Sequence, residues 1–379
     1  MPSIASRPYT ARVGNKTVAV PTKWEEHAAY YDGNGDHKVT LTEIRDKLTR
    51  IPEAMSVDTK DYAVSIRQQM LELKSPHLDA YPSNKEIEKK LKDLAKLHRA
   101  KAQVVTIGES TEGRPIKALR VSHNVRSKAS HNKPSVVITG NLHAREWAAN
   151  GAVTAAAEKL LEGANEQALE DLEVWFVPNA NPDGYEHSRN VNPMWRKNTW
   201  RNDQGEIAGV DLNRNFSQNY RKAGDTAGSS SDDQGASDLP ENDTFRGTGP
   251  LSEPETQAVK GLLDQETNAV GVLDVHSFGR MILVSEGEYD VSREEYNSIA
   301  DSMNKAIGRV DYSILSVEEL YPATGGFSEY ADSLGKVGMT LEIGTSFQPN
   351  PNKAVGIIER ASNGIVEFVN QMEERVSAT

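Results

Sequence analysis

The chain has 379 residues, enough for one large α/β domain with an appendage or for two to three smaller domains. Lysine and arginine number 43 against 55 aspartate and glutamate residues, which gives a formal net charge of -12. This charge disfavours nucleic acid and anionic membranes as partners, because both attract cationic surfaces. The absence of cysteine excludes disulfides, thiolate catalysis and cysteine-ligated metals, so a transition metal would need histidine and carboxylate ligands.

The start of the chain gives little sign of targeting. No stretch approaches the roughly 18 consecutive apolar residues of a membrane span, and residues 1–24 lack the apolar core of a signal peptide. We therefore expect a monomer that is secreted by a leaderless route, with the cytoplasm as the alternative location. Residues 1–22 have no clear periodicity, which predicts an arm with short extended pieces.

Helical patterns dominate the next part of the chain. Residues 23–51 predict two short helices on either side of an acidic, glycine-containing loop, and a third pattern covers about 58–73. Prolines then precede a long helical pattern that begins near Ser83 and Asn84, both of which are good helix caps. We place a domain boundary near residues 75–82, so that 1–75 and 76–379 form separate regions.

The loop DGNGDHKVTLTE matches the spacing of an EF-hand calcium loop. Asp32, Asn34 and Asp36 take positions one, three and five, and Lys38 would offer its backbone carbonyl at position seven. Glu43 takes position twelve, where a bidentate glutamate completes the oxygen shell. The spacing predicts a Ca²⁺ site between two helices, and an Asx-rich turn is the alternative.

One residue departs from this calcium pattern. His37 stands at position six, where glycine eases a sharp turn, so a side chain there must adopt a positive φ at some cost in strain. A single EF-hand loop normally seeks a partner surface, and the sequence has no second loop of this type. We therefore expect the N-terminal region to dock on the second domain.

Beyond residue 80, short apolar runs alternate with helical patterns. The runs SVVITG, LEVWFVP, AVGVLDV and VGMTLEI predict buried strands, and WAANGAVTAAAEKLLEG, EPETQAVKGLLDQ, REEYNSIADSMNKAIG and VGIIERASNGIVEFVNQMEE predict helices. Continuous apolar strands between helices are typical of an α/β fold with a mostly parallel or mixed sheet covered on both faces. Ligands of such folds bind at the carboxyl ends of the strands.

Metal-binding side chains stand at two of these strand ends. His143 and Glu146 lie three residues apart, directly after SVVITG, where a strand gives way to a helix. His276 ends the strand AVGVLDV. Two histidines, one carboxylate and a water form the open, four-coordinate arrangement of a hydrolytic zinc site, although any one of these residues alone is more often structural.

Several further segments follow in a fixed order. They are GESTEGRPIKALRVS, NLHAREWAA, NPDGYEHSRNVNPMWRKN, GVDLNRNF, GPLSEPETQAV, LYPATGGFSEYA and MTLEIGTSF. Together they resemble the zinc metallocarboxypeptidases related to pancreatic carboxypeptidases A and B, over about residues 80–375. The resemblance implies a carboxypeptidase-like α/β fold and a metallo-exopeptidase activity.

The resemblance assigns roles around the metal. It implies that His143, Glu146 and His276 bind one Zn²⁺, and that Asp211 accepts a hydrogen bond from a ring N–H of His143 and fixes that ring. Glu342 matches the general base that takes a proton from the attacking water. A carboxylate that closes an apolar strand is costly unless it is paired or functional.

The resemblance also implies a binding site for a peptide carboxylate. Arg196 matches the arginine that stabilises the tetrahedral oxyanion. Asn213 and Arg214 match the clamp on the substrate's terminal carboxylate, and guanidinium geometry suits such a bidentate pair. Tyr321 matches the mobile tyrosine that closes over that terminus, and Arg145 an accessory anion contact.

Side-chain preference is less well defined by the sequence. Ser328 falls where, by the resemblance, an aspartate would signal a preference for lysine or arginine, and Glu329 is its neighbour. The other expected lining residues make a roomy, mostly neutral pocket; they are Gly287, Ser316, Leu320 and Ala323. We expect a preference for neutral or apolar C-terminal residues, with basic residues as the alternative.

Three functions are compatible with these residues. The first is a zinc carboxypeptidase that acts on peptides or proteins with a free C-terminus. The second is an amidase of cell-wall stem peptides, and the third is a calcium-responsive binding protein with an inactive peptidase domain. The complete ligand set and carboxylate clamp favour the first. Because relatives often carry a pro-region, we also hypothesise that residues 1–75 restrain activity.

Overall fold

The structure is a computed structural model, and it describes the residues in ten ranges. These are 9–13, 16–20, 28–29, 31–32, 34–48, 80–220, 235–264, 268–308, 312–320 and 324–378. The predicted helix at 58–73 lies outside the described residues, as do residues 221–234.

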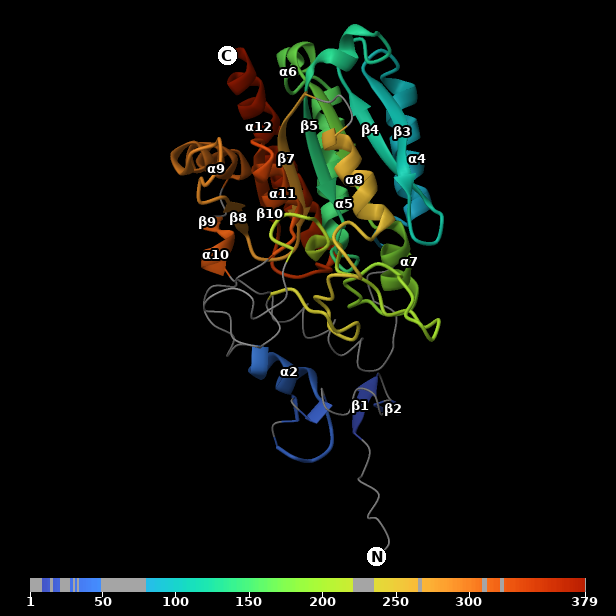
Figure 1. The fold of residues 1–379 in the computed structure, drawn as a ribbon. Coiled ribbons are helices and arrows are strands. Elements are labelled where there is room, and N and C mark those ends of the chain that lie inside the picture. Colours follow the sequence, from blue (N-terminus) through green and yellow to red (C-terminus); the bar gives the residue numbers. More distant parts are fainter. Residues whose placement is uncertain are drawn as a thin grey trace, which may run out of the picture.

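A mixed sheet of eight strands, in the order β3-β4-β6-β5-β7-β10-β8-β9, forms the centre of the molecule (Figure 1). The four strands predicted from apolar runs are its four central ones, and they all run parallel. They are β5 (Pro134–Gly140), β6 (Glu173–Val177), β7 (Asn268–His276) and β10 (Val337–Glu342). The expected α/β fold with a mixed sheet is therefore confirmed.

The outer strands of the sheet were not predicted. They are β3 (Ala102–Glu109) and β4 (Pro115–Val121) at one edge, and β8 (Met281–Val284) and β9 (Ser313–Ser316) at the other. The edge strand β3 is only partly buried along most of its length, and β8 and β9 have four residues each. Neither kind of strand produces the long apolar run that marks a strand buried on both faces.

Two apolar cores lie on the two faces of the sheet. Adjacent residues of β5 alternate between them, with Val136 and Ile138 in the first core and Val137 in the second. The helices of the first core are α4 (Asn84–Leu97), α5 (Trp147–Leu161), α6 (Glu166–Asp171), α9 (Arg293–Ile307) and α12 (Pro351–Ser377). Those of the second core are α8 (Pro254–Asp264) and α11 (Phe327–Ser333).

The remaining short elements cap or connect this framework. They are the 3₁₀ helices η3 (Ala129–Asn132) and η4 (Leu212–Arg214) and the α-helices α7 (Pro182–Asn190) and α10 (Val317–Leu320). Ser83 caps α4 as expected, because its side chain accepts the N–H of Glu86 and the Glu86 carboxylate accepts the N–H of Ser83. Within the described parts of the chain, every helix is too short or too polar to span a bilayer.

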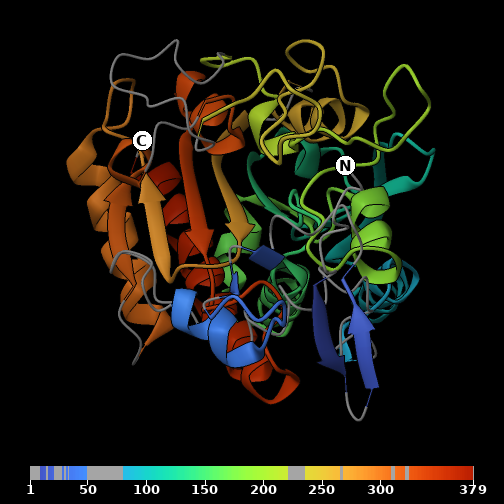
Figure 2. The same ribbon diagram turned by 90° about the horizontal axis from the view of Figure 1, so that it is seen from below.

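The N-terminal region has a small core of its own. Strands β1 (Thr10–Val13) and β2 (Lys16–Ala19) pair antiparallel, which confirms short extended pieces in the arm. Helix α2 (Leu41–Leu48) follows the acidic loop, and the apolar core joins Ala11, Val20, Ala28, Val39 and Ile44. Figures 1 and 2 place these elements at the end of the molecule where the carboxyl ends of the parallel strands lie.

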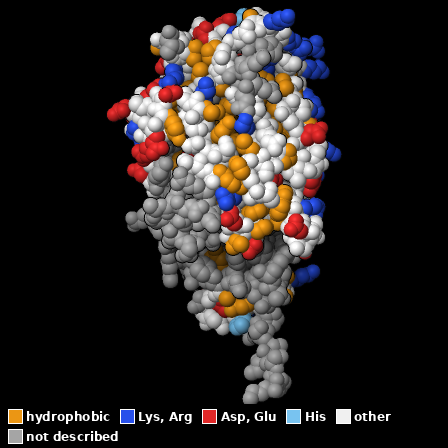
Figure 3. Space-filling model, in the orientation of Figure 1, with side chains coloured by type: hydrophobic (Ala, Val, Ile, Leu, Met, Phe, Trp, Pro, Cys, Tyr) orange, Lys and Arg blue, Asp and Glu red, His pale blue; other side chains and the backbone are white. Residues whose placement is uncertain are grey.

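Charge is unevenly distributed over the surface. Residues 84–133 carry 13 Lys and Arg against 5 Asp and Glu, whereas the rest of the chain carries 30 against 50. In Figure 3, Lys and Arg side chains gather along the upper right edge, where Figure 1 places α4, β3 and β4.

Candidate zinc site and active site

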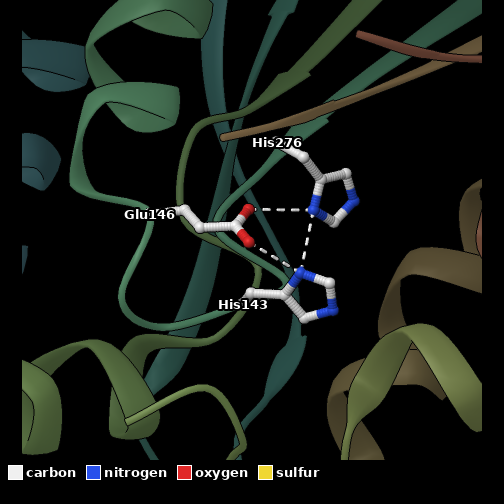
Figure 4. Close-up of side chains that lie close together, drawn as sticks. All are labelled: His143, Glu146 and His276. Carbon is white, nitrogen blue, oxygen red and sulfur yellow. Dashed lines mark hydrogen bonds and ion pairs between the residues drawn. The ribbon is translucent and has the colours of Figure 1, made fainter. Parts of the chain in front are cut away.

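The three predicted metal ligands meet at the carboxyl ends of two neighbouring strands. His143 follows β5, Glu146 immediately precedes α5, and His276 is the last residue of β7. Because β5 and β7 pair in parallel, their ends bring these residues together. All three side chains are buried, and one ligand atom from each lies within 4.8 Å of the others (Figure 4).

The atoms that face one another in this cluster are all suited to bind a cation. His143 Nδ1 and His276 Nδ1 each lie 2.9 Å from a different oxygen of Glu146. The two Nδ1 atoms are 3.0 Å apart. In a tetrahedral site with Zn–N bonds of about 2.0 Å, the two nitrogens would lie about 3.3 Å apart. The spacing of the donors therefore fits zinc.

Two buried carboxylates orient the histidine rings from behind. His143 Nε2 lies 3.1 Å from Asp211 Oδ1, and His276 Nε2 lies 2.6 Å from Asp274 Oδ2. An acceptor at Nε2 holds the ring proton there, which leaves Nδ1 with its lone pair directed at the centre of the cluster. The two Nδ1 atoms and the Glu146 carboxylate then converge without a proton between them, which suits a divalent cation.

Asp274 was missed by the sequence analysis, although the sequence contains a signal for it. It is a fully buried acid inside the apolar strand AVGVLDV, two residues before His276. Residues two apart on a strand share a face, so Asp274 points to the same side as the ligand. A carboxylate in an apolar strand costs free energy unless it is paired or functional, and this reasoning, used above for Glu342, applies equally to Asp274.

Glu342 lies beside the cluster of three predicted metal ligands. It ends β10, pairs in register with His276, and its neighbour Ile343 donates a backbone hydrogen bond to His276 O at 2.8 Å. Its Oε2 atom is buried and has no hydrogen-bond partner among the described residues. Burial raises the pKa of Glu342 to about 8.

Arg196 is fixed next to the cluster by the carboxylate that also holds His143. Its Nε donates to Asp211 Oδ2 at 2.9 Å, and its backbone oxygen accepts from Ala144 N at 2.9 Å. Burial opposes the charge of Asp211, yet Arg196 and His143 together hold the pKa of that carboxyl well below its usual range.

The expected carboxylate clamp lies on η4, directly after Asp211. Asn213 Oδ1 accepts from Phe327 N at 2.9 Å, and Arg214 is buried with its Nη1 donating to Asn213 O at 2.7 Å. Gly325 has a φ of 72°, in the left-handed region, and it packs so closely that an added Cβ would lie 2.5 Å from Arg214 O. The close packing of this glycine connects the clamp to α11.

The other predicted substrate contacts are only partly described. Arg145 Nη1 donates to Met194 O at 3.3 Å and to Asp243 Oδ2 at 3.2 Å, and its guanidinium lies 4.2 Å from the centroid of the Phe347 ring. Ser328 is buried, with its Oγ 2.9 Å from Thr340 Oγ1. Tyr321 and Ala323 lie outside the described residues.

Comparison with known proteins identifies the family. The profile described as zinc carboxypeptidase matches residues 87–363, more than half of the chain. The chain belongs to the zinc carboxypeptidase family. Zinc carboxypeptidase A 1 of Anopheles gambiae is 27% identical to this chain over 315 residues, which cover 78% of this chain and 68% of the Anopheles protein.

Two moth proteins give further comparisons. Carboxypeptidase B of Helicoverpa zea is 35% identical over 214 residues, which cover 55% of this chain and 47% of that relative. The crystal structure of carboxypeptidase A from Helicoverpa armigera is similar with a TM-score of 0.68 and 25% identity, and the match covers 95% of this chain and 83% of that chain.

The candidate calcium loop lies in the N-terminal region. The side chains at positions one, three and five are Asp32, Asn34 and Asp36. Each accepts at least one hydrogen bond from a backbone N–H further along the loop, at 2.8 to 3.0 Å. Lys38 follows at position seven, and Glu43 Oε2 accepts from Thr40 N at 2.9 Å. No comparison supports a calcium site here.

The same loop pairs with β1. Thr10 N donates to His37 O and Val39 N donates to Thr10 O, both at 2.9 Å, and the His37 ring stacks on Tyr9 at 4.6 Å between centroids. His37 has the expected positive φ, at 62°. Thr10 of β1 therefore forms a parallel bridge with Lys38 of the loop.

Proposed function

We propose that this chain removes single residues from the free C-terminus of peptides or proteins. Zinc bound by His143, Glu146 and His276 would polarise the scissile carbonyl and activate a water. Glu342 accepts a proton from that water as its oxygen adds to the carbonyl carbon. When the C–N bond breaks, Glu342 returns the proton to the leaving amine and is regenerated as a carboxylate.

One observation carries this proposal. The buried Oε2 of Glu342 has no partner among the described residues, and its strand ends in register with His276. A buried carboxylate without a donor costs free energy, so its position next to a three-ligand metal cluster supports a role in proton transfer. Arg196, which is fixed by Asp211, is placed to stabilise the oxyanion that forms on the carbonyl oxygen.

The restriction to the last residue follows from the clamp. Asn213 and Arg214 lie on η4, which starts directly after Asp211, and would bind the terminal carboxylate. Tyr321 would close over that terminus, and Arg145 would be an accessory anion contact. The test compares two peptides of identical sequence, one with a free C-terminus and one with a C-terminal amide. We expect the zinc-loaded enzyme to shorten only the free acid. Equal cleavage of both would contradict the clamp, and cleavage only of cell-wall stem peptides would support the amidase alternative.

We also propose that the loop 32–43 binds one Ca²⁺. Its support is the full set of EF-hand ligand positions, and Glu43 Oε1, a buried atom without a partner among the described residues. Isothermal titration of the zinc-loaded full chain with Ca²⁺ should show one Ca²⁺ site. The matched variant Glu43→Gln should lose that site while it keeps zinc. Identical titrations of both proteins would contradict the calcium proposal.

A third proposal concerns the division of the chain at residues 75–82. Residues 1–75 would act as a pro-region, because their described elements lie at the end of the molecule that carries the active site (Figure 2). Limited proteolysis of the full chain, followed in time by peptide hydrolysis and mass spectrometry, tests this idea. Activity that rises as the 76–379 fragment appears would support it, and activity that is constant throughout would contradict it.

A further inference from the structure

Next to Ser328, the structure contains a small cavity with only acidic charge in its lining. The cavity has a volume of about 40 Å³ and lies between β8, α10 and α11. Four carboxylates line it, from Glu286, Glu288, Glu329 and Asp332. None of the described lining residues is a lysine, arginine or histidine. The space is small, and it suits the head group of one side chain.

Asp332 is the buried member of this acidic group. It is only 3% exposed, and its two oxygens accept from Ser285 Oγ and from Tyr296 OH, both at 2.6 Å. Among the described residues it forms no ion pair. Two hydroxyl donors orient the carboxylate but do not neutralise it, so a cation that enters the cavity would gain a strong, poorly screened attraction.

The cavity begins close to β10, the strand that ends in Glu342. Ser328 lines it, and Ser328 Oγ lies 2.9 Å from Thr340 Oγ1 on β10. Thr340 precedes Glu342 by two residues, so both side chains point to the same side of the strand. The residue before Ser328, Phe327, donates its N–H to Asn213 of the clamp. A side chain held between the clamp and Glu342 would therefore point toward this space.

The distance along α11 matters for the length of that side chain. Asp332 follows Ser328 by four residues, one turn of the helix, and its carboxylate therefore lies about 6 Å further along the helix surface. Only a long side chain would bring a charge to that depth. Lysine and arginine combine this length with a terminal positive charge, whereas leucine and phenylalanine would bring no charge to Asp332. Of the other lining carboxylates, Glu286 already forms an ion pair with Arg293 at 3.0 Å.

We propose that the cavity is the end of the pocket for the substrate's C-terminal side chain, and that Asp332 selects lysine and arginine. This inference rests on the proposed exopeptidase function and names its substrate class. It favours the alternative that the sequence left open over the neutral preference. The acidic charge comes from a position one helical turn beyond Ser328, the residue at which the family resemblance would place an aspartate.

The test measures kcat/KM of the zinc-loaded full chain for four peptides that differ only in a C-terminal Lys, Arg, Leu or Phe. We expect the basic peptides to be favoured by about tenfold or more. Asp332→Asn should lower kcat/KM for Lys and Arg by about tenfold or more and leave the Leu peptide within about twofold. The matched control Asp301→Asn, an exposed acid on α9, should keep the wild-type ratio.

Three results would overturn parts of this account in distinguishable ways. A wild-type preference for Leu or Phe, or an unchanged Lys-to-Leu ratio in Asp332→Asn, would contradict the selection by Asp332 and leave the exopeptidase intact. Hydrolysis of none of the four peptides would contradict the proposed function itself. If circular dichroism shows that Asp332→Asn does not fold, Ser328→Leu decides instead, because it narrows the entrance and should reduce Lys and Arg cleavage selectively.

Discussion

Arg196 donates its Nε–H to Asp211 at 2.9 Å, through the carboxylate oxygen that does not face the metal cluster. The other oxygen of Asp211 lies 3.1 Å from His143 Nε2. One fully buried carboxylate therefore holds a metal ligand and the proposed oxyanion arginine in a fixed relation. A substitution of Asp211 would therefore disturb both groups at once.

This shared support predicts a double defect in Asp211→Asn. The amide lacks the charge that holds both partners, so we expect zinc affinity to fall by about 10- to 100-fold. At saturating zinc, kcat should still be reduced, because Arg196 loses its ion pair. Zinc titration and steady-state kinetics on the same preparation separate the two effects. The exposed Asp203→Asn serves as the control, and full recovery of kcat at saturating zinc would argue against a role for Asp211 in positioning Arg196.

Removing the base should leave the metal in place. In Glu342→Gln the side chain keeps its size but accepts no proton from water, and we expect kcat to fall by about 10²- to 10⁴-fold. Zinc content, measured by elemental analysis, should stay at the wild-type level because Glu342 is not a ligand. A variant with near wild-type turnover would show that another group takes the proton.

The clamp can be tested through substrate charge. Arg214→Lys keeps a positive charge but loses the paired N–H donors, so kcat/KM for free-acid peptides should fall by about tenfold or more, with zinc retained. Cleavage of a C-terminally amidated peptide should stay as low as in the wild type. If Arg214→Lys cleaves the free acid as fast as the wild type does, Arg214 does not bind the terminal carboxylate.

A buried acid away from the metal predicts how stability depends on pH. Asn198 Nδ2 donates to Glu253 Oε2 at 2.7 Å and to Glu255 Oε2 at 3.2 Å, and burial raises the pKa of Glu255 to about 7. The folded protein thus keeps this proton to a higher pH than the unfolded chain does. The corresponding stability is complete below the unfolded value near 4.5 and is lost as pH rises toward 7.

The size of that loss is measurable. Ionisation of Glu255 should lower the free energy of unfolding by about 3 kcal/mol between pH 4.5 and 8. Glu255→Gln keeps hydrogen-bonding atoms and cannot ionise, so its stability should decline less over this range. Denaturant unfolding at several pH values in saturating zinc compares the two proteins. Parallel pH profiles would mean that Glu255 has an ordinary pKa in the folded state.

The strained turn of the N-terminal loop predicts a gain in calcium affinity. His37 has a φ of 62°, which costs a non-glycine residue about 1 kcal/mol. If the loop binds Ca²⁺ as proposed, His37→Gly should relieve that strain in the bound state and raise the affinity by up to about fivefold. Isothermal titration measures the change, and Gly35→Ala, at a φ of 73°, should act in the opposite direction. Equal affinities in all three proteins would contradict this prediction.

The sequence predicted those parts of the structure that depend on burial in a continuous sheet. Apolar runs make up most of the four central strands, and these runs predicted the strands. The metal ligands were predicted because they stand at or just after the ends of β5 and β7. Asp274 was recoverable by the same argument but was overlooked. The short strands β8 and β9 have too few residues for a pattern, and the pairing of Arg145 with Asp243 joins loops that are far apart in the chain.

The acidic cavity shows a different limit of sequence reasoning. Positions inferred from family resemblance directed attention to Ser328, which carries no charge. The contacts of Asp332 with Ser285 and Tyr296 join α11 to a loop and to α9, and such contacts are visible only once the helices are packed. Charge at the end of a pocket is thus a property of the tertiary structure.

The most direct test of the central claim follows release of the C-terminal residue while zinc is added to metal-free protein. We expect no release without metal, then a linear rise in release to a plateau at one zinc per chain. In His276→Ala we expect neither zinc binding nor release. Release that is independent of zinc, or one tightly bound zinc without any release from free-acid peptides, would contradict the central claim.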